Sequence, residues 1–416
     1  MEDATILTLA PWYLLLENVQ KHVPSEIKVH MEPIVSLLNK NYQSIGNLSS
    51  DWIKKSLILT EASLDKTWEV LNSGYWKDVP IEYRYTYSIC TTVKAVLLDI
   101  QSECRTEDFI GNKESMKRSI IKQIDKGILL GAPLPNMPSL LTTIASNINI
   151  YLSSLKKTAG SKEIVIDTES IYDEIPPRFS PLHSLDEPSM ESFYRDVFMP
   201  KKPAILRGCI QHWKAITQWK NLDYLNQIAG SRTVPIEIGS RYTEDDWTQH
   251  LVNFSDFLQE HITKKNDRVG YLAQHQLFDQ IPELKDDFTV PEYCSFSDSD
   301  DPERPDINAW FGPAGTVSPL HFDPKNNLLC QVFGYKRVIL YHPDDTPNLY
   351  PYDTRLLNNT AQVDPINPDY EKWPDLHKAK GIMCYLKAGE MLYIPPKWWH
   401  HVISLTPSFS VSFWWD

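Results

Sequence analysis

Apolar residues in the first part of the chain recur at the spacing of an amphipathic helix. Residues 51–72 show this most clearly, because their apolar positions lie three, four or seven apart and form one stripe on a helix. The stripe consists of Ile53, Leu57, Leu64, Trp68 and Leu71. Similar stripes occur in segments 33–41, 87–100, 115–130 and 138–155. The pattern predicts a helical domain of about six helices over residues 1–157.

The polar and apolar pattern changes after this region. Residues 158–185 include the stretches T-A-G-S-K-E and D-E-I-P-P-R-F-S-P, with few large apolar side chains, and predict a linker. Residues 186–416 then contain short runs of β-forming residues separated by Gly, Pro and Asp clusters. The runs are 203–207, 234–238, 308–311, 328–333, 336–341, 382–386, 390–394, 400–404 and 408–413. This pattern predicts an all-β barrel or sandwich preceded by a few helices.

Composition narrows the class of protein. The 416 residues, of which 42% are apolar, are enough for two or three domains with substantial cores. The net charge of -13 argues against direct binding of nucleic acid and is compatible with a basic peptide partner. The six cysteines include no C-x-x-C pair, which argues against a zinc ribbon. They are scattered along a long chain, so we expect reduced thiols and an intracellular protein. The apolar run at residues 6–16 is too short to cross a membrane. We therefore do not expect the protein to bind a membrane.

The segment S-P-L-H-F-D-P-K-N-N at residues 318–327 contains candidate metal ligands. Side chains two apart in a strand point to the same face, so His321 and Asp323 would face one metal ion while Phe322 points to the opposite layer. An H-x-D pair alone is a weak signal, because it occurs by chance in many long proteins.

A second segment, G-E-M-L-Y-I-P-P-K-W-W-H-H-V-I-S, strengthens the metal hypothesis. A strand that follows the two prolines would bring a histidine beside His321, and two histidines with one carboxylate form the facial triad of non-haem iron oxygenases. Zinc would accept the same ligands without the oxygen chemistry. His400 and His401 are adjacent and would face opposite ways in a strand, so periodicity does not decide which of them is the ligand.

Other polar residues are placed where a cavity would need them. Lys336 opens a predicted strand after Gly334; it either lies in solvent or faces the barrel interior, where it requires an anionic partner. Ser318 and Asn327 flank the H-x-D pair. In the last strand, Ser412 and Trp414 alternate with apolar positions and would face a cavity.

Together, S-P-L-H-F-D, N-N-L-L-C-Q-V-F-G-Y-K-R and Y-I-P-P-K-W-W-H-H-V resemble the jumonji-C domain of Fe(II)- and 2-oxoglutarate-dependent oxygenases. The resemblance covers the second half densely and the helical half only loosely. It implies an α+β protein whose residues 186–416 form a double-stranded β-helix, a jelly-roll of the cupin type. It also implies Fe(II), 2-oxoglutarate and O₂ as cofactor and co-substrates.

The resemblance further implies individual roles. His321, Asp323 and His400 would bind iron, which makes His401 a neighbour, and Lys336 would bind the far carboxylate of 2-oxoglutarate. The other residues expected to contact this co-substrate or to shape its pocket are Tyr271, Ser318, Asn327 and Trp414.

The implied substrate is a protein or peptide. Members of the most similar subgroup hydroxylate arginine side chains at carbon 3, and demethylation or cleavage of methylated histone tails are the alternatives. Glu237, Gln274 and Trp310 are candidate contacts to an arginine, because they offer a carboxylate, an amide and an indole face. Histones or ribosomal and chromatin-associated proteins are the expected partners. The resemblance implies a role in chromatin regulation in the nucleus, with the cytoplasm as the alternative location. The helical domain is expected to bind a partner protein; a different reading makes the barrel a scaffold and the helices the working part.

Overall fold

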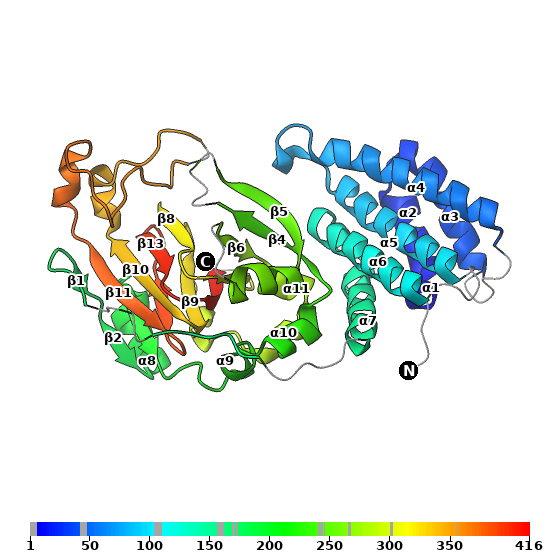
Figure 1. Cartoon of the computed structure of the whole chain (residues 1–416). Coiled ribbons are helices and arrows are strands. Elements are labelled where there is room, and N and C mark those ends of the chain that lie inside the picture. Colours follow the sequence, from blue (N-terminus) through cyan, green and yellow to red (C-terminus); the bar gives the residue numbers. More distant parts are fainter. Residues whose placement is uncertain are drawn as a thin grey trace. The chain divides into compact units, whose positions relative to one another are not determined.

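The computed structural model describes residues 6–41, 48–103, 110–155, 162–168, 171, 174–239, 244, 246–264, 268–299, 303–355 and 357–416. The chain forms two compact units (Figure 1). The first contains Met1–Thr158 together with Asn226–Thr233 and Asn253–Ser255. The second contains Ala159–Leu225, Val234–Val252 and Asp256–Asp416. The domain boundaries expected at residues 157 and 185 stay a prediction.

The first unit is helical, as the apolar stripes predicted. Its elements are α1 (Ile6–Leu9), α2 (Trp12–His22), α3 (Ser25–Asn41), α4 (Ser50–Leu71), η2 (Trp76–Asp78), α5 (Ile81–Glu103), α6 (Ile110–Leu130) and α7 (Leu140–Ser154). Helix α5 packs against α4 and α6, and α6 packs against α7. Helix α3 begins eight residues before the predicted start at Pro33, because buried Ile27 and Met31 extend the apolar face across the proline.

The predicted stripe on α4 is only partly buried. Ile53 and Leu64 are buried, but Trp68 is 51% exposed. The rest of the buried face consists of the small residues Ser56, Thr60, Ser63 and Thr67. Their burial is possible because hydroxyls bond to the carbonyl four residues earlier; Thr60 Oγ1, for example, donates to Ser56 O at 2.7 Å. Hydroxyls that are satisfied within the helix allow α4 to pack against α5 without a continuous apolar stripe.

The second unit is a β-sandwich of the jelly-roll type, which confirms the predicted fold class (Figure 1). One sheet has the order β1-β11-β10-β13-β8 and the other the order β2-β3-β12-β9-β14-β7-β6-β4-β5. The strands of the first sheet are β1 (Ser180–Pro181), β8 (Val317–His321), β10 (Tyr335–Tyr341), β11 (Ile382–Lys387) and β13 (Trp399–Ser404). Those of the second are β2 (Ser184–Asp186), β3 (Ala204–Arg207), β4 (Thr233–Ile238), β5 (Thr248–Asn253), β6 (Gly270–His275), β7 (Asp306–Gly312), β9 (Asn326–Phe333), β12 (Met391–Ile394) and β14 (Ser408–Trp415).

Short helices surround these sheets along the chain. They are α8 (Met190–Phe193), η3 (Tyr194–Phe198), α9 (Lys214–Gln218), α10 (Leu222–Ala229), α11 (Phe254–Phe257), η4 (Leu258–Thr263), α12 (Leu277–Gln280), η5 (Pro282–Asp287), η6 (Glu292–Ser295), η7 (Pro343–Asn348) and η8 (Pro374–Lys378). Among the helices of the described residues, none is long and apolar enough to cross a membrane.

The inner faces of the two sheets share one hydrophobic core. Leu329 and Leu392 from one sheet belong to the same buried cluster as Val338 and Val402 from the other. A second cluster, with Ile339 and Trp399, covers the outer face of the smaller sheet. Side chains therefore alternate between these two layers along β10 and β13, and this alternation determines which polar residues face the interior.

All nine predicted strand segments coincide with strands, but β1, β2, β5, β6 and β8 were not predicted as separate strands. Several of these are short or polar, so their alternation is weak. Strand β8 ends at His321, and Asp323 lies in the segment that follows. Asp323 therefore lies outside the strand in which it was expected, but its carboxylate and the imidazole of His321 do face one point, as expected. Phe322 points to the outer layer, where its ring centroid lies 4.9 Å from that of Trp399.

Candidate metal and co-substrate site

Two adjacent strands and a short connection bring His321, Asp323 and His400 together. His321 ends β8 and is the register partner of His400 on the antiparallel strand β13. The Oδ2 atom of Asp323 lies 3.9 Å from Nε2 of His321 and 3.5 Å from Nε2 of His400. One ligand atom from each of the three residues lies within 4.8 Å of the other two, the only such grouping of His, Cys, Asp and Glu in the described residues.

Backbone contacts orient both imidazoles. Nδ1 of His321 lies 2.7 Å from the carbonyl of Pro319, and Nδ1 of His400 lies 3.0 Å from the carbonyl of Trp398. A carbonyl only accepts hydrogen bonds, so each Nδ1 carries the proton and each Nε2 presents a lone pair. Burial and the neighbouring His321 lower the pKa of His400 to about 4, so this ring is neutral at pH 7.

The charge distribution between these three side chains is suited to a bound cation. Oδ2 of Asp323 is buried and has no hydrogen-bond partner among the described residues, while two imidazole lone pairs face it. Such an arrangement leaves negative charge unbalanced, which is costly in a protein interior. Two nitrogens and one carboxylate oxygen on one side of a divalent ion are a suitable ligand set for Fe(II) and leave other positions open.

The neighbouring histidine lies in the other layer. His401 is the register partner of Ile339, whose side chain belongs to the outer hydrophobic cluster. His400 is the partner of Leu340, which belongs to the inner core. The structure therefore places His400, and not His401, with His321 and Asp323.

A cavity opens directly from the three candidate ligands into the sandwich. Its lining consists of Tyr271, Trp310, Ser318, His321, Asp323, Asn327, Leu329, Lys336, Ile394, His400, Val402 and Trp414. The expected co-substrate residues Tyr271, Ser318, Asn327, Lys336 and Trp414 are thus all in one place. Leu329, Ile394 and Val402 were not singled out from the sequence. The sequence did contain a signal for two of them, because side chains two apart in a strand share a face. Val402 lies two residues after His400, and Leu329 two residues after Asn327.

Lys336 is the single ammonium in this lining. Its side chain is 1% exposed, so the alternative of a lysine in solvent is excluded. Burial lowers its pKa to about 7, and no carboxylate of the described residues forms an ion pair with it. Its Nζ lies 6.0 Å from the ring centroid of Tyr271. An anion that entered the cavity would supply the missing partner.

Two further polar groups point to a ligand in the same cavity. Oδ1 of Asn327 and Nε1 of Trp414 are buried and have no hydrogen-bond partner among the described residues. These two residues are register partners on β9 and β14, so they lie side by side. Tyr271 is also buried, which raises the pKa of its phenol, and Ser318 lines the cavity with it. The cavity therefore offers an acceptor, an N–H donor and a hydroxyl beside an unpaired cation.

The expected substrate contacts are not gathered in this cavity. Trp310 lines it, and its Nε1 donates to Ser412 Oγ at 2.8 Å. Glu237 lies outside the lining on β4, opposite Tyr271 of β6, and its Oε2 accepts from Trp247 Nε1 at 3.2 Å. Burial raises the pKa of Glu237. Gln274 is exposed, with a φ of 44°, in the irregular part of β6.

Comparison with known proteins agrees with this architecture. The model of the cupin-like domain family matches residues 190–416. The chain is 39% identical over 439 residues to "Jumonji C domain-containing protein 5" of Drosophila melanogaster, with 100% of this chain and 99% of that protein covered. It is 42% identical over 365 residues to "Lysine-specific demethylase 8" of Danio rerio, with 85% and 86% covered.

A more distant relative carries a different activity in its name. The "Bifunctional peptidase and (3S)-lysyl hydroxylase JMJD7" of Homo sapiens is 28% identical over 293 residues, with 62% of this chain and 87% of that protein covered. The family match and the two relatives that align over most of their length, together with the jelly-roll and its histidine–aspartate cluster, show that the chain belongs to the cupin-like jumonji-C family of oxygenases.

Proposed function

We propose that the chain is an Fe(II)- and 2-oxoglutarate-dependent hydroxylase of protein side chains, and that it acts on arginine at carbon 3. The observation that carries the oxygenase part is the pairing, in one cavity, of three metal-binding side chains with a buried lysine that lacks an anionic partner. Bound iron would supply the activation of O₂, coupled to oxidation of 2-oxoglutarate.

The chain's own residues would hold the reactants. His321, Asp323 and His400 would bind the iron, with both Nε2 atoms already oriented by backbone carbonyls. Lys336 would pair with the far carboxylate of 2-oxoglutarate. The polar contacts would come from Asn327 and Trp414, whose side chains lack partners, and from Tyr271 and Ser318. The apolar side chains of Leu329, Ile394 and Val402 would exclude water from the reacting centre.

The arginine preference is supported by the groups next to the cavity. Trp310 presents an indole at its wall, and Glu237 is a half-buried carboxylate on the strand next to Tyr271. A guanidinium would stack on the former and pair with the latter. Gln274 is exposed, so it would contact a substrate only outside the cavity.

Demethylation of lysine is the second candidate function, because relatives that align over most of their length are named lysine-specific demethylases. The same site would serve, since hydroxylation of an N-methyl carbon releases that carbon as formaldehyde. A peptidase activity is favoured only by the name of the more distant human relative. The helical unit would bind a partner protein, and a chromatin-associated substrate would require a nuclear location.

Reconstitution tests the proposal. The protein is loaded with Fe(II) and 2-oxoglutarate without oxygen, then exposed to air with arginine or methyl-lysine peptides, and the products are analysed by mass spectrometry. A gain of one oxygen on arginine supports the proposal, whereas loss of a methyl group without this gain supports demethylation. His400→Ala should abolish turnover and His401→Ala should retain it; a scaffold role for the barrel would give no turnover in any variant.

A further inference from the structure

A short segment of the second half of the sequence belongs to the helical unit. Asn226–Thr233, here called the anchor segment, ends at the first residue of β4, and Asn253–Ser255 begins at the last residue of β5. Both groups pack in the first unit, while the body of the β4–β5 hairpin belongs to the second. The two ends of this hairpin therefore start and finish in the helical unit.

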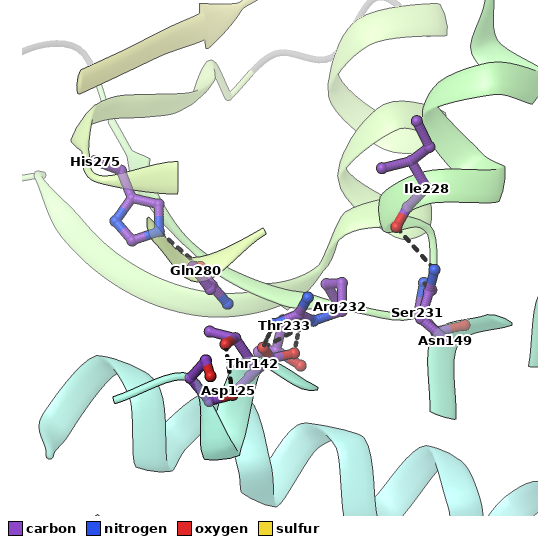
Figure 2. A network of polar contacts seen from close by, with 10 residues as sticks. Asp125, Thr142, Asn149, Ile228, Ser231, Arg232, Thr233, His275 and Gln280 are labelled. Carbon is purple, nitrogen blue, oxygen red and sulfur yellow. Dashed lines mark hydrogen bonds and ion pairs between the residues drawn. The ribbon is translucent and has the colours of Figure 1, made fainter. Parts of the chain in front are cut away.

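The anchor segment is held by a buried carboxylate of α6 (Figure 2). Oδ1 of Asp125 accepts from Nη2 of Arg232 at 2.7 Å and from its Nε at 3.0 Å, and both side chains are 0% exposed. Oδ2 of the same aspartate accepts from the backbone N of Thr233 at 2.6 Å. Thr233 is the first residue of β4. The same aspartate therefore binds the guanidinium of Arg232, just before this strand, and the first backbone amide of the strand.

A second side chain, on α7, holds the backbone of the anchor segment (Figure 2). Nδ2 of Asn149 donates to the carbonyl of Ile228 at 2.7 Å, and Oδ1 accepts from the N of Ser231 at 3.2 Å. Buried backbone groups outside regular structure need such partners. Helices α6 and α7 thus supply hydrogen bonds that the anchor segment does not obtain from a sheet.

The same segment closes the base of the hairpin. The carbonyl of Arg232 accepts from Phe254 N at 2.8 Å, and the carbonyl of Gly230 accepts from Ser255 N at 3.2 Å. These bonds join the residues before β4 to those after β5. Any movement of Arg232 would therefore displace both strands of the hairpin.

Strand β4 leads from this base to the cavity. Glu237, four residues after Thr233, is the register partner of Tyr271, which lines the cavity. Strand β5, at the edge of the sheet, is largely exposed, so the outer side of the hairpin has little packing of its own. Lys336, Asn327 and Trp414 lie on β10, β9 and β14, which are other strands.

We propose that Asp125 is a positioning residue: through Arg232 and Thr233 it fixes the base of the β4–β5 hairpin, and so places Glu237 next to the cavity. Under this proposal, the two binding steps depend on different parts of the protein. The helical unit affects how the protein substrate binds, whereas binding of the anionic co-substrate depends on strands that the anchor does not hold. The part about substrate rests on the proposed function; the part about the hairpin does not.

Hydrogen exchange on the full-length Asp125→Asn variant tests the structural part. The amides of 234–238 and of 270–271 should exchange about tenfold faster than in the wild type, while β9, β10 and β14 keep their protection. Asp99→Asn is a matched control, because Asp99 is also buried, pairs with Lys117 at 2.8 Å and accepts from the N of Ile6 at 2.9 Å. Among the described residues, no hydrogen bond or ion pair joins Asp99 to the anchor segment, and we expect no effect on β4.

Kinetics test the functional part. In Asp125→Asn, the KM for the protein substrate should rise by about threefold or more, with an unchanged KM for 2-oxoglutarate and unchanged turnover of 2-oxoglutarate without protein substrate. Unchanged protection of β4, loss of protection throughout the second unit, or an equal effect of Asp99→Asn would overturn the proposal. Faster exchange in β4 with no protein hydroxylation by the wild type would overturn only the proposed function.

A double variant covers the case in which Asp125→Asn does not fold. Asp125→Leu combined with Arg232→Met replaces the buried ion pair by apolar side chains, which proteins often tolerate. It still lacks the acceptor for Thr233 N, so β4 should exchange faster than in the wild type. Wild-type protection of β4 in the folded double variant would contradict the positioning role.

Discussion

The imidazole rings of His321 and His400 lie with their centroids 4.2 Å apart, at paired positions of two antiparallel strands. Their Nδ1 atoms face backbone carbonyls and their Nε2 atoms face Oδ2 of Asp323. This arrangement turns two lone pairs and one carboxylate toward the same point. It is the geometric basis of the metal site that we propose.

Metal binding should stabilise the protein through these three residues. Addition of Mn²⁺ or Co²⁺ as stand-ins for iron is expected to raise the Tm, with about 2.7 kcal/mol gained at 100 times the Kd. Asp323→Ala should weaken metal affinity by more than about 100-fold and abolish the rise in Tm. The control is His401→Ala, which should keep the rise, and calorimetric titration gives both affinities. Equal binding by Asp323→Ala and the wild type would refute the site.

Co-substrate binding should depend on pH through Lys336. Because burial lowers its pKa to about 7, the ammonium loses its proton above that pH in the free protein, and binding a dianion must restore it. We expect the Kd for 2-oxoglutarate to rise by about tenfold per pH unit above 7. Lys336→Met should bind much more weakly and lose this dependence, which titration calorimetry between pH 6 and 9 will measure; a flat wild-type profile would contradict it.

The same lysine should cost stability in the absence of an anion. Its folded pKa of about 7 lies below the ordinary value of 10.5, so the unfolded chain binds more protons between these values. The cost is therefore complete below pH 7 and shrinks as the pH rises toward 10.5. Lys336→Met should raise the Tm without co-substrate, most strongly at low pH, and thermal unfolding across this range will show whether the difference narrows.

Glu237 should act on the protein substrate and not on the co-substrate. Glu237→Gln is expected to raise the KM for an arginine peptide by about tenfold or more, because the charge-assisted pair with the guanidinium is lost. Its effect on 2-oxoglutarate affinity should be small. Burial raises the pKa of this carboxyl, so removal of the charge should not reduce the Tm. The exposed Glu371 offers a matched control in Glu371→Gln, and a wild-type KM in Glu237→Gln would remove this residue from the substrate site.

Two positions on α4 should differ sharply although the sequence pattern treats them alike. Leu64 is 6% exposed and Trp68 is 51% exposed. Leu64→Ala should cost about 2–5 kcal/mol of unfolding free energy, because a cavity remains. Trp68→Ala should cost less than about 1 kcal/mol. Denaturant unfolding measures both, and a larger loss for Trp68→Ala would show that its ring is packed.

Many of the helices and strands could be predicted from the sequence, because their periodicity depends only on residues that are close together along the chain. The helical stripes and nine strand segments followed from side-chain spacing, and the resemblance to the jumonji-C domain identified His321, Asp323, Lys336 and the surrounding polar residues. The predicted buried stripe of α4 was partly wrong. Ser and Thr form much of the buried face, because their hydroxyls bond to carbonyls of the same helix and can therefore be buried. The weak alternation of β5 and β6 left both strands unpredicted.

By itself, the sequence determined the two classes of structure along the chain and the residue types available for metal and anion binding. Spacing could not choose between His400 and His401, could not tell whether Lys336 is buried, and could not link Asp125 to Arg232, 107 residues later. The tertiary structure decided these points. Strand register and burial place one face of each strand inside the sandwich, and such contacts depend on pairings between residues far apart in sequence.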